Sequence, residues 1–155
     1  HGHVDHILAV DDLRDRFHIP VYAHEDEKMV LESTRYNLST MFGAAYTTKA
    51  DIYLKDGEEF TAAGFRIKVL HTPGHTPGGC CYYLKEENTL FSGDTLFRFS
   101  IGRTDFPGGS MSQLVRAIKE KLFVLPEETV VYPGHESPTQ IGREKVYNPF
   151  CGGDL

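Results

Sequence analysis

The sequence has no tryptophan, only three cysteines and no long apolar run. Three cysteines without Cys-x-x-Cys spacing form neither a disulfide framework nor a zinc ribbon. No stretch approaches the ~20 apolar residues that a membrane-spanning helix needs. Basic residues are also scarce, 16 against 22 acidic ones, and the net charge of −6 argues against binding to nucleic acid or anionic membranes. We therefore expect a cytoplasmic protein with reduced cysteines that binds neither nucleic acid nor membrane.

The apolar content fits one folded domain. The chain has 155 residues, of which 40% are hydrophobic and 25% charged, and a chain of this length buries roughly 68–70% of its unfolded surface in a single core. It contains no repeat and no linker, so we predict one domain over residues 1–155. Helix-like and strand-like patterns alternate along it, which predicts an α/β (α+β) fold with layered sheets.

Helices are predicted where apolar residues recur every three or four positions, and strands where short runs are apolar or alternating. The clearest helix spans 110–123, with Ser110 as its N-cap, and the clearest hairpin joins 80–84 to 89–91. A second helix is predicted over 7–17, and its apolar face consists of Ile7, Leu8, Leu13 and Phe17. The other segments are a looser helical stretch over 25–41 and strands at 21–23, 52–54, 59–60, 65–70 and 129–132.

Histidine is abundant, and the eight histidines are unevenly spread. The first six residues, HGHVDH, contain three of them beside one aspartate. Imidazole nitrogen and carboxylate oxygen are ligands of first-row metals, of which zinc is the commonest. So short an arc does not place His1, His3 and Asp5 around one ion, and its spacing fits two ions better. The alternatives for this segment are a remnant of an expression tag and a solvated polar end.

Three further loops place a polar residue after a strand-like segment, where functional groups usually lie. His75 lies between two Pro-Gly turns in the run HTPGHTPGG, which fix the backbone around it. Asp94 follows the strand over 89–91, and His135 follows the strand over 129–132 through another Pro-Gly pair. Taken singly, these loops also fit a surface histidine on a turn and an Asx turn. The four loops together are far more specific.

The four motifs occur in the order HxHxDH, PGH, GDT and PGH. This series resembles the metallo-β-lactamase superfamily and, within it, the short single-domain glyoxalase II-like (hydroxyacylglutathione hydrolase-like) proteins. The runs IGRTDFPGG, IGREK and NPF resemble the same subgroup. The resemblance extends from residue 1 to nearly the C-terminus, and it implies an αββα sandwich of the metallo-β-lactamase type.

Carried over by position, the resemblance implies a dinuclear metal site. The cofactor would be two divalent ions, with zinc favoured and iron or manganese as alternatives. One ion would be held by His1, His3 and His75, the other by Asp5, His6 and His135, and Asp94 would bridge them.

The resemblance also implies a mechanism, in which Asp5 and Asp94 are the catalytic residues. A hydroxide that bridges the metals is the nucleophile, because two cations lower the pKa of bound water far below that of free water. One ion polarises the substrate carbonyl. Since no cysteine nucleophile is needed, Cys80 and Cys81 are interpreted as buried strand residues.

Substrate contacts are less well defined by the sequence. In the longer glyoxalase II enzymes the region of Arg103 helps to bind glutathione, so Arg103 is predicted to pair with a substrate carboxylate, with bracing of its loop as the alternative. Those enzymes place tyrosines near the positions of Asp105 and Ser137 and carry a C-terminal helical domain, which leaves glutathione specificity open. His71 matches no ligand position and is given a structural role; His18 and His24 have weaker functional signals still.

The predicted function is a metal-dependent hydrolase of thioesters, such as S-lactoylglutathione or a related hydroxyacyl thioester, with this small molecule as its partner. One alternative is a persulfide dioxygenase relative with a single iron held by two histidines and one aspartate. A nuclease of the same superfamily is disfavoured by the acidic charge. A further alternative is an inactive fold with a structural or binding role, because family members have strands before the HxHxDH loop. We accordingly expect this domain to lack its N-terminal strands.

Overall fold

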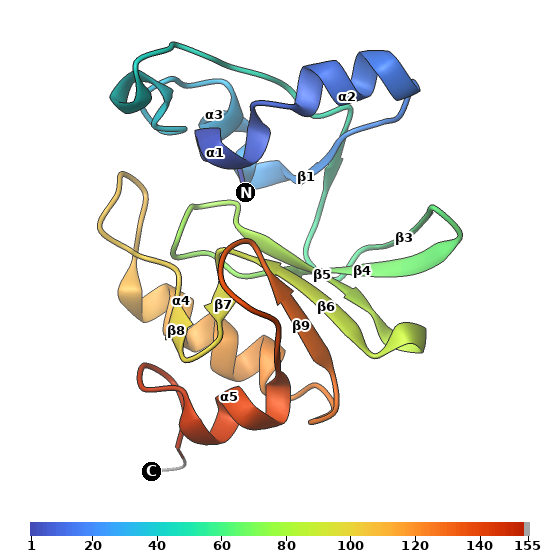
Figure 1. Cartoon of the computed structure of the whole chain (residues 1–155), viewed down its shortest axis with the longest axis vertical. Helices are drawn as coiled ribbons and strands as arrows, with labels where there is room; N and C mark the ends of the chain where they lie inside the picture. The colour runs from blue at the N-terminus through green and yellow to red at the C-terminus, as the bar shows by residue number, and fades with distance from the viewer. Residues whose placement is uncertain (154–155) are drawn as a thin grey trace.

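The computed structural model describes residues 1–153. Its largest element is a six-stranded sheet in the order β10-β9-β6-β5-β4-β3 (Figure 1). Neighbouring strands are antiparallel, except that β6 and β9 are parallel. The strands are β3 (Glu59–Ala62), β4 (Phe65–His71), β5 (Cys80–Leu84), β6 (Thr89–Gly93), β9 (Val130–Pro133) and β10 (Thr139–Gln140).

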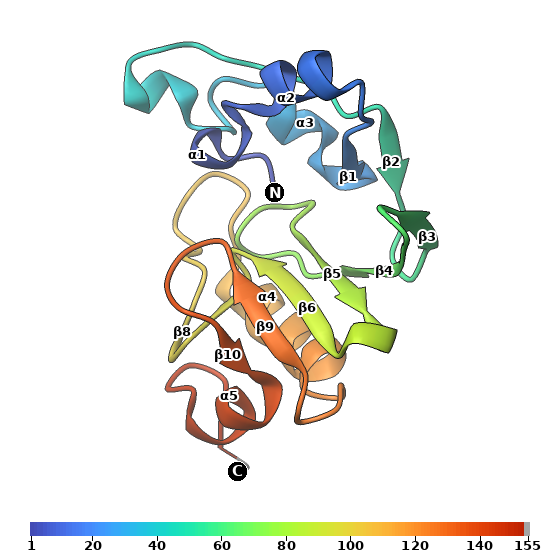
Figure 2. The same ribbon diagram turned by 45° about the vertical axis from the view of Figure 1, so that its right-hand side comes forward.

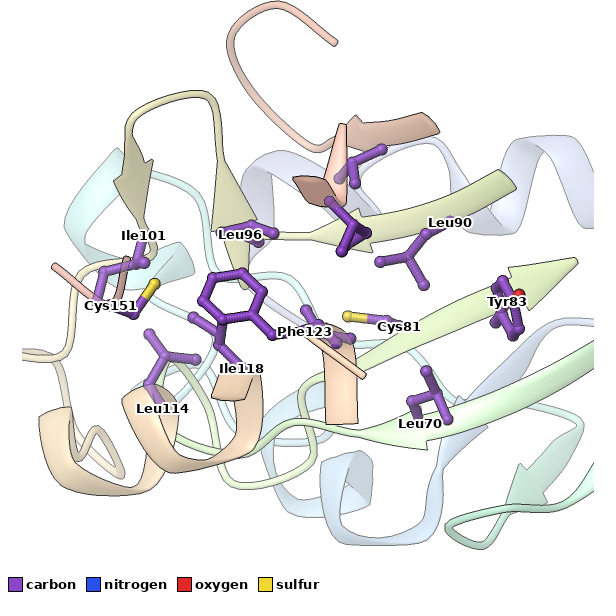
Figure 3. Packing of buried hydrophobic residues seen from close by; sticks show 13 residues of the cluster. Leu70, Cys81, Tyr83, Leu90, Leu96, Ile101, Leu114, Ile118, Phe123 and Cys151 are labelled. Carbon is purple, nitrogen blue, oxygen red and sulfur yellow. The ribbon is translucent and has the colours of Figure 1, made fainter. Parts of the chain in front are cut away.

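Two helices and the sheet enclose the main core. These helices are α4 (Met111–Ala117), which continues as a π-helical turn η4 (Ile118–Leu122), and α5 (Ile141–Tyr147). Leu114 and Ile118 belong to the same buried cluster as Leu90 and Cys81 of the sheet (Figure 3), and all four are completely buried. Burial of one leucine or isoleucine side chain stabilises the fold by ~1.5–3 kcal/mol, so this interface fixes α4 on the sheet.

The first part of the chain forms a second layer that lies above the sheet in Figures 1 and 2. Its two strands pair in parallel, and Leu54, Val69 and Cys80 form a small apolar cluster between this layer and the sheet. The N-terminus lies between the two layers (Figure 1). The elements of this layer are α1 (Val4–Ile7), α2 (Val10–Phe17), β1 (Tyr22–His24), η1 (Glu25–Glu27), α3 (Lys28–Leu31), η2 (Ser39–Phe42) and β2 (Ile52–Leu54).

The mixed α/β class predicted from the sequence is confirmed. The hairpin of β5 and β6 is present, with the 3₁₀ turn η3 (Lys85–Glu87) at its tip. Ser110 caps α4, because its Oγ accepts a hydrogen bond from the Gln113 amide (3.4 Å). Cys80 and Cys81 are buried free thiols in β5, as predicted. No helix within residues 1–153 has the length and apolar character to cross a membrane.

Other predicted elements differ in the structure. The helix expected over 7–17 is divided into α1 and α2, and most of its supposed core face is exposed, with Leu13 at 47% and Phe17 at 58%. Only short turns and α3 form within the stretch 25–41. The helix α5 was not predicted from the sequence. The strand β10 and the pair β7 (Leu96–Phe97) and β8 (Ser100–Ile101) were also missed, because two-residue strands carry no periodicity.

Candidate metal centre

Strand direction gathers three of the predicted residues at one edge of the sheet. Since β5 is antiparallel to both β4 and β6, and β9 is parallel to β6, the strands β4, β6 and β9 run in the same direction. His75, Asp94 and His135 follow the carboxyl ends of these three strands. Residues 1–6, which end in α1, reach the same edge from the other layer. The structure thus brings all seven predicted ligand residues together.

His1, His3 and His75 form the first group of facing donor atoms. Nδ1 of His3 lies 3.0 Å from Nε2 of His75, and the His1 ring stands edge-on to both other rings. Both nitrogens of His1 are buried without a hydrogen-bond partner among residues 1–153. Two or three imidazole lone pairs that face one another repel unless a proton or a cation lies between them.

Asp5, His6 and His135 form the second group. Oδ2 of Asp5 lies 3.3 Å from Nε2 of His6 and 3.1 Å from Nε2 of His135. The two histidine nitrogens are 3.2 Å apart. Asp5 and His135 are each 51% exposed, so this group faces solvent, whereas His3 and His75 of the first group are buried.

Asp94 lies between the two groups. Its Oδ2 is 3.3 Å from Nε2 of both His6 and His75, and 3.6 Å and 3.5 Å from Nε2 of His1 and His135. Burial acts to raise the pKa of Asp94, but hydrogen bonds with His6 and His75 outweigh it and hold this pKa well below its usual range. The carboxylate is therefore ionised, and it faces histidine nitrogens of both groups.

A bulge and a glycine place the Asp94 carboxylate. The pairing of β6 with β9 shifts register between Phe91 and Gly93, immediately before Asp94. The Gly134 amide donates to the Gly93 carbonyl (2.7 Å), which brings the two loops together. A Cβ on Gly134 would collide with Oδ1 of Asp94 and Cε1 of His6. The sequence predicted the Pro-Gly turn at this position, but not that a side chain there would displace two predicted ligands.

Surrounding contacts orient one imidazole of the first group and lower the pKa of another. Nδ1 of His75 donates to the Arg103 carbonyl (2.6 Å), which fixes the ring with its Nε2 directed into the site. Burial, and after it the neighbouring His75, lower the pKa of His3 to about 4. His3 is consequently neutral at physiological pH, the state that a metal ligand requires.

This donor set fits divalent metal ions. Within each group the donor atoms lie within 4.8 Å of one another, and Oδ1 of Asp94 is buried with no hydrogen-bond partner among residues 1–153. Neutral imidazoles and carboxylates are the ligands of zinc and of iron in proteins. Asp94 supplies negative charge where the two groups meet.

A cleft of about 530 Å³ opens over Asp94. Arg103 borders it, but this guanidinium forms two 2.7 Å hydrogen bonds to Asp105 and lies 4.0 Å from the Phe106 ring centre. Arg98, which the sequence did not single out, borders the same cleft and lies over Phe99. Among the residues described, Arg98 pairs with no carboxylate, so it is the less compensated of the two cations.

His24, Asp26 and His71 also place ligand-type atoms near one another. The rings of His24 and His71 stack with centres 3.8 Å apart and an interplanar angle of 9°. Parallel rings direct their lone pairs along parallel planes, so the two nitrogens do not converge on one ion. Nε2 of His71 lies 2.9 Å from the Pro77 carbonyl. These contacts agree with the structural role predicted for His71.

Comparison with known proteins gives the same class. Residues 1–135 match the family described as the metallo-beta-lactamase superfamily. The chain is 43% identical over 155 residues to the probable metallo-hydrolase YqgX of Bacillus subtilis (strain 168), covering 99% of this chain and 74% of that protein. It is 38% identical over 157 residues to the hydroxyacylglutathione hydrolase GloC of Haemophilus influenzae, covering 97% of this chain and 72% of that protein.

Solved structures share the fold. The crystal structure of the BLEG-1 B3 metallo-beta-lactamase has a TM-score of 0.93 and 46% identity, over 99% of this chain and 75% of that chain. That of TTHA1623 in a di-iron-bound form has a TM-score of 0.84 and 36% identity, over 97% of this chain and 74% of that chain. The chain therefore belongs to the metallo-β-lactamase superfamily, which confirms the resemblance found in its motifs. It is related to metallo-hydrolases.

Proposed function

We propose that this chain is a hydrolase of small thioesters, with a hydroxyacyl thioester such as S-lactoylglutathione as substrate and two divalent ions as cofactor. The observation that carries the proposal is the ionised Asp94, which lies between two groups of metal-ligand atoms beneath an open cleft. The similarity to a relative named as a hydroxyacylglutathione hydrolase supports the choice of substrate.

The residues that would hold the ions also define what the chain contributes. When bound, two divalent ions would lower the pKa of a coordinated water and polarise a carbonyl group. Asp94 compensates their charge, and the hydrogen bond from Nδ1 of His75 to the Arg103 carbonyl keeps that ring oriented. Zinc is the favoured ion, with iron or manganese as alternatives. The ligands would be His1, His3 and His75 for one ion, Asp5, His6 and His135 for the other, and Asp94 for both.

The leaving group of a thioester suits this site. In the proposed centre the imidazoles and carboxylates are ligands, so they are not free to protonate a departing group. A thiol has a pKa of ~8.5 and leaves as a thiolate without a proton donor. Cys81 is no competing nucleophile, because burial raises the pKa of its thiol to about 12. Thioester cleavage thus needs only what the proposed centre provides.

The cleft walls fit a substrate with an acyl group and a carboxylate. Phe42 and Phe106 give the cleft an apolar side, and Arg98 and Arg103 give it positive charge. We assign Arg98 together with Arg103 to the substrate carboxylate, since Arg103 already shares its charge with Asp105. The sequence pointed to Arg103 alone, because the resemblance places it in the region that helps to bind glutathione in the longer glyoxalase II enzymes.

The test uses the whole chain loaded separately with zinc, iron or manganese. Elemental analysis gives metal per chain, and release of free thiol from S-lactoylglutathione gives hydrolysis. We expect two ions per chain and thiol release in the wild type, with both lost in Asp94→Ala. A chain that binds two ions but leaves every thioester intact would refute the proposal.

The same preparations distinguish the proposed hydrolase from the main alternative, a persulfide dioxygenase. A persulfide dioxygenase relative would bind one iron per chain and consume oxygen in the presence of glutathione persulfide. Oxygen uptake by the iron-loaded chain, with no thiol release from thioesters, would replace the proposed hydrolase with that enzyme.

A further inference from the structure

Glu27 is a carboxylate that the proposed mechanism does not use, yet it is almost completely buried, with 1% of its surface exposed. It ends the 3₁₀ turn η1 in the N-terminal layer. Its side chain accepts three hydrogen bonds, from the Gly2 amide (2.6 Å), the Thr76 hydroxyl (3.0 Å) and the Gly78 amide (2.8 Å). Burial of a charge is costly unless such donors compensate it.

The three donors belong to two different ligand loops. Gly2 lies between His1 and His3, and its amide bonds to Oε1 of Glu27. Thr76 follows His75 directly, and Thr76 and Gly78 both bond to Oε2. One carboxylate therefore joins the loops that carry all three imidazoles of the first group, one loop on each oxygen.

The chain is shaped for this contact. A Cβ on Gly78 would collide with the backbone nitrogen of Glu27, and a Cβ on Gly2 would lie 3.0 Å from a side-chain carbon of Leu31. Glycine at both positions lets the loops approach closely. Glu27 also comes from a separate element, so it supports the two loops from outside.

We infer that Glu27 is a positioning residue for the metal centre: it holds the loops of residues 1–3 and 75–78 in register, so that the imidazoles of His1, His3 and His75 face one another. The inference rests on the metal centre of the proposed function and not on its substrate. Without the carboxylate the two loops lose a shared hydrogen-bond acceptor, and the first group of donor atoms must be ordered by the ion itself.

Glu144 offers a matched control. It is also completely buried, and it accepts three hydrogen bonds, from the Phe99 amide (2.8 Å), the Thr139 hydroxyl (2.6 Å) and the Asn148 amide group (3.0 Å). None of these donors adjoins a predicted ligand. A purely structural buried carboxylate would behave alike at both positions, whereas a positioning role is specific to Glu27.

The experiment compares wild type, Glu27→Gln and Glu144→Gln as chains of 155 residues freed of metal by chelation. Cobalt(II) is the probe, because its visible spectrum reports ligand geometry, and a chromophoric chelator gives the affinity by competition. Glutamine keeps the shape of the glutamate side chain. Its NH₂ group, however, replaces one accepting oxygen and therefore faces an N–H or O–H group of one loop with no acceptor for it. We expect roughly a 10-fold loss of cobalt affinity and an altered spectrum in Glu27→Gln. Glu144→Gln should keep the cobalt affinity and the spectrum of the wild type, even if its melting temperature falls as much as that of Glu27→Gln.

A milder variant keeps the test open if Glu27→Gln does not fold. Thr76→Val removes one donor to Glu27 and should lower the affinity in the same direction by a smaller factor. Unchanged cobalt binding in Glu27→Gln, an equal loss in Glu144→Gln, or unchanged binding in Thr76→Val would overturn the inference. Cobalt binding is measured without substrate, so a wild type that binds cobalt but cleaves no thioester would refute the proposed hydrolase alone.

Discussion

His71 and His75 lie in the same turn-rich loop, but their hydrogen bonds differ. Nδ1 of His75 bonds to the Arg103 carbonyl, so Nε2 faces the site, whereas Nε2 of His71 bonds to the Pro77 carbonyl. We expect His75→Ala to lose metal and His71→Ala to keep the wild-type content. Elemental analysis after dialysis checks both variants. Equal metal loss in the two would show that the loop, and not the His75 ligand, decides binding.

At Gly134 the absence of a side chain allows Asp94 and His6 to lie close to the backbone. An added Cβ would collide with Asp94 and His6, so Gly134→Ala should shift both side chains and lower metal affinity by roughly 10-fold. The comparison variant is Gly57→Ala. Gly57 has a positive φ of 78° but nothing within 4 Å of its added Cβ, so this change strains the backbone without touching the centre. Tight metal binding by Gly134→Ala would contradict the predicted collision.

At the scale of elements, η1 begins at an imidazole cap that makes stability sensitive to pH. Nδ1 of His24 accepts from the Asp26 amide (3.1 Å), and the ring stacks on His71. Burial, then His71, lower the pKa of His24 from its ordinary 6.5, while Asp26, Glu25 and Asp56 act to raise it. The unfolded chain therefore takes up this proton first as the pH falls, so the contribution is complete above about pH 6.5 and declines below it.

The variant His24→Asn tests this dependence. Asparagine is a good N-cap and can accept from the Asp26 amide, but it does not titrate. Between about pH 7 and pH 5.5, on either side of the ordinary histidine pKa, the free energy of unfolding should fall less in His24→Asn than in the wild type. Urea unfolding of the metal-free chains measures both slopes, and equal slopes would assign the wild-type dependence to other groups.

The helices and strands also show which structural features a sequence pattern does not predict. The residues of α4 and of the β5–β6 hairpin were predictable because their apolar side chains repeat and pack against one core. The same repeat in α2 predicted a buried face, yet Leu13 and Phe17 are exposed. Periodicity predicts that a helix is amphipathic; it does not identify what the apolar face packs against. The short strands β7, β8 and β10 depend on tertiary pairing alone.

At the scale of the whole molecule, the seven residues predicted as ligands could be named from the sequence because their motifs are local runs, and the structure brings these residues together. The residues that arrange them were not found, because their contacts join distant positions. Glu27 bonds to Gly2 and Thr76, which lie 25 and 49 positions away, and no local pattern distinguishes it from a surface glutamate. Arg98 was missed for a related reason, since only the folded chain places it on the cleft.

The arrangement of the two layers gives metal removal a global effect. Each group of donor atoms takes ligands both from residues 1–6 of the N-terminal layer and from loops of the sheet. An ion that binds only the folded chain stabilises it by ~2.7 kcal/mol at a free concentration of 100 times its dissociation constant. We expect chelation to lower the melting temperature and zinc to restore it.

Hydrogen exchange locates this effect within the molecule. Removal of metal should speed the exchange of α1 amides, since α1 carries Asp5 and His6, far more than that of α4, which the core holds. His75→Ala is the control and should show a smaller shift of melting temperature with zinc, because its first group lacks one imidazole. A melting temperature that chelation leaves unchanged, in a chain shown to lose its metal, would mean that the ions do not join the two layers.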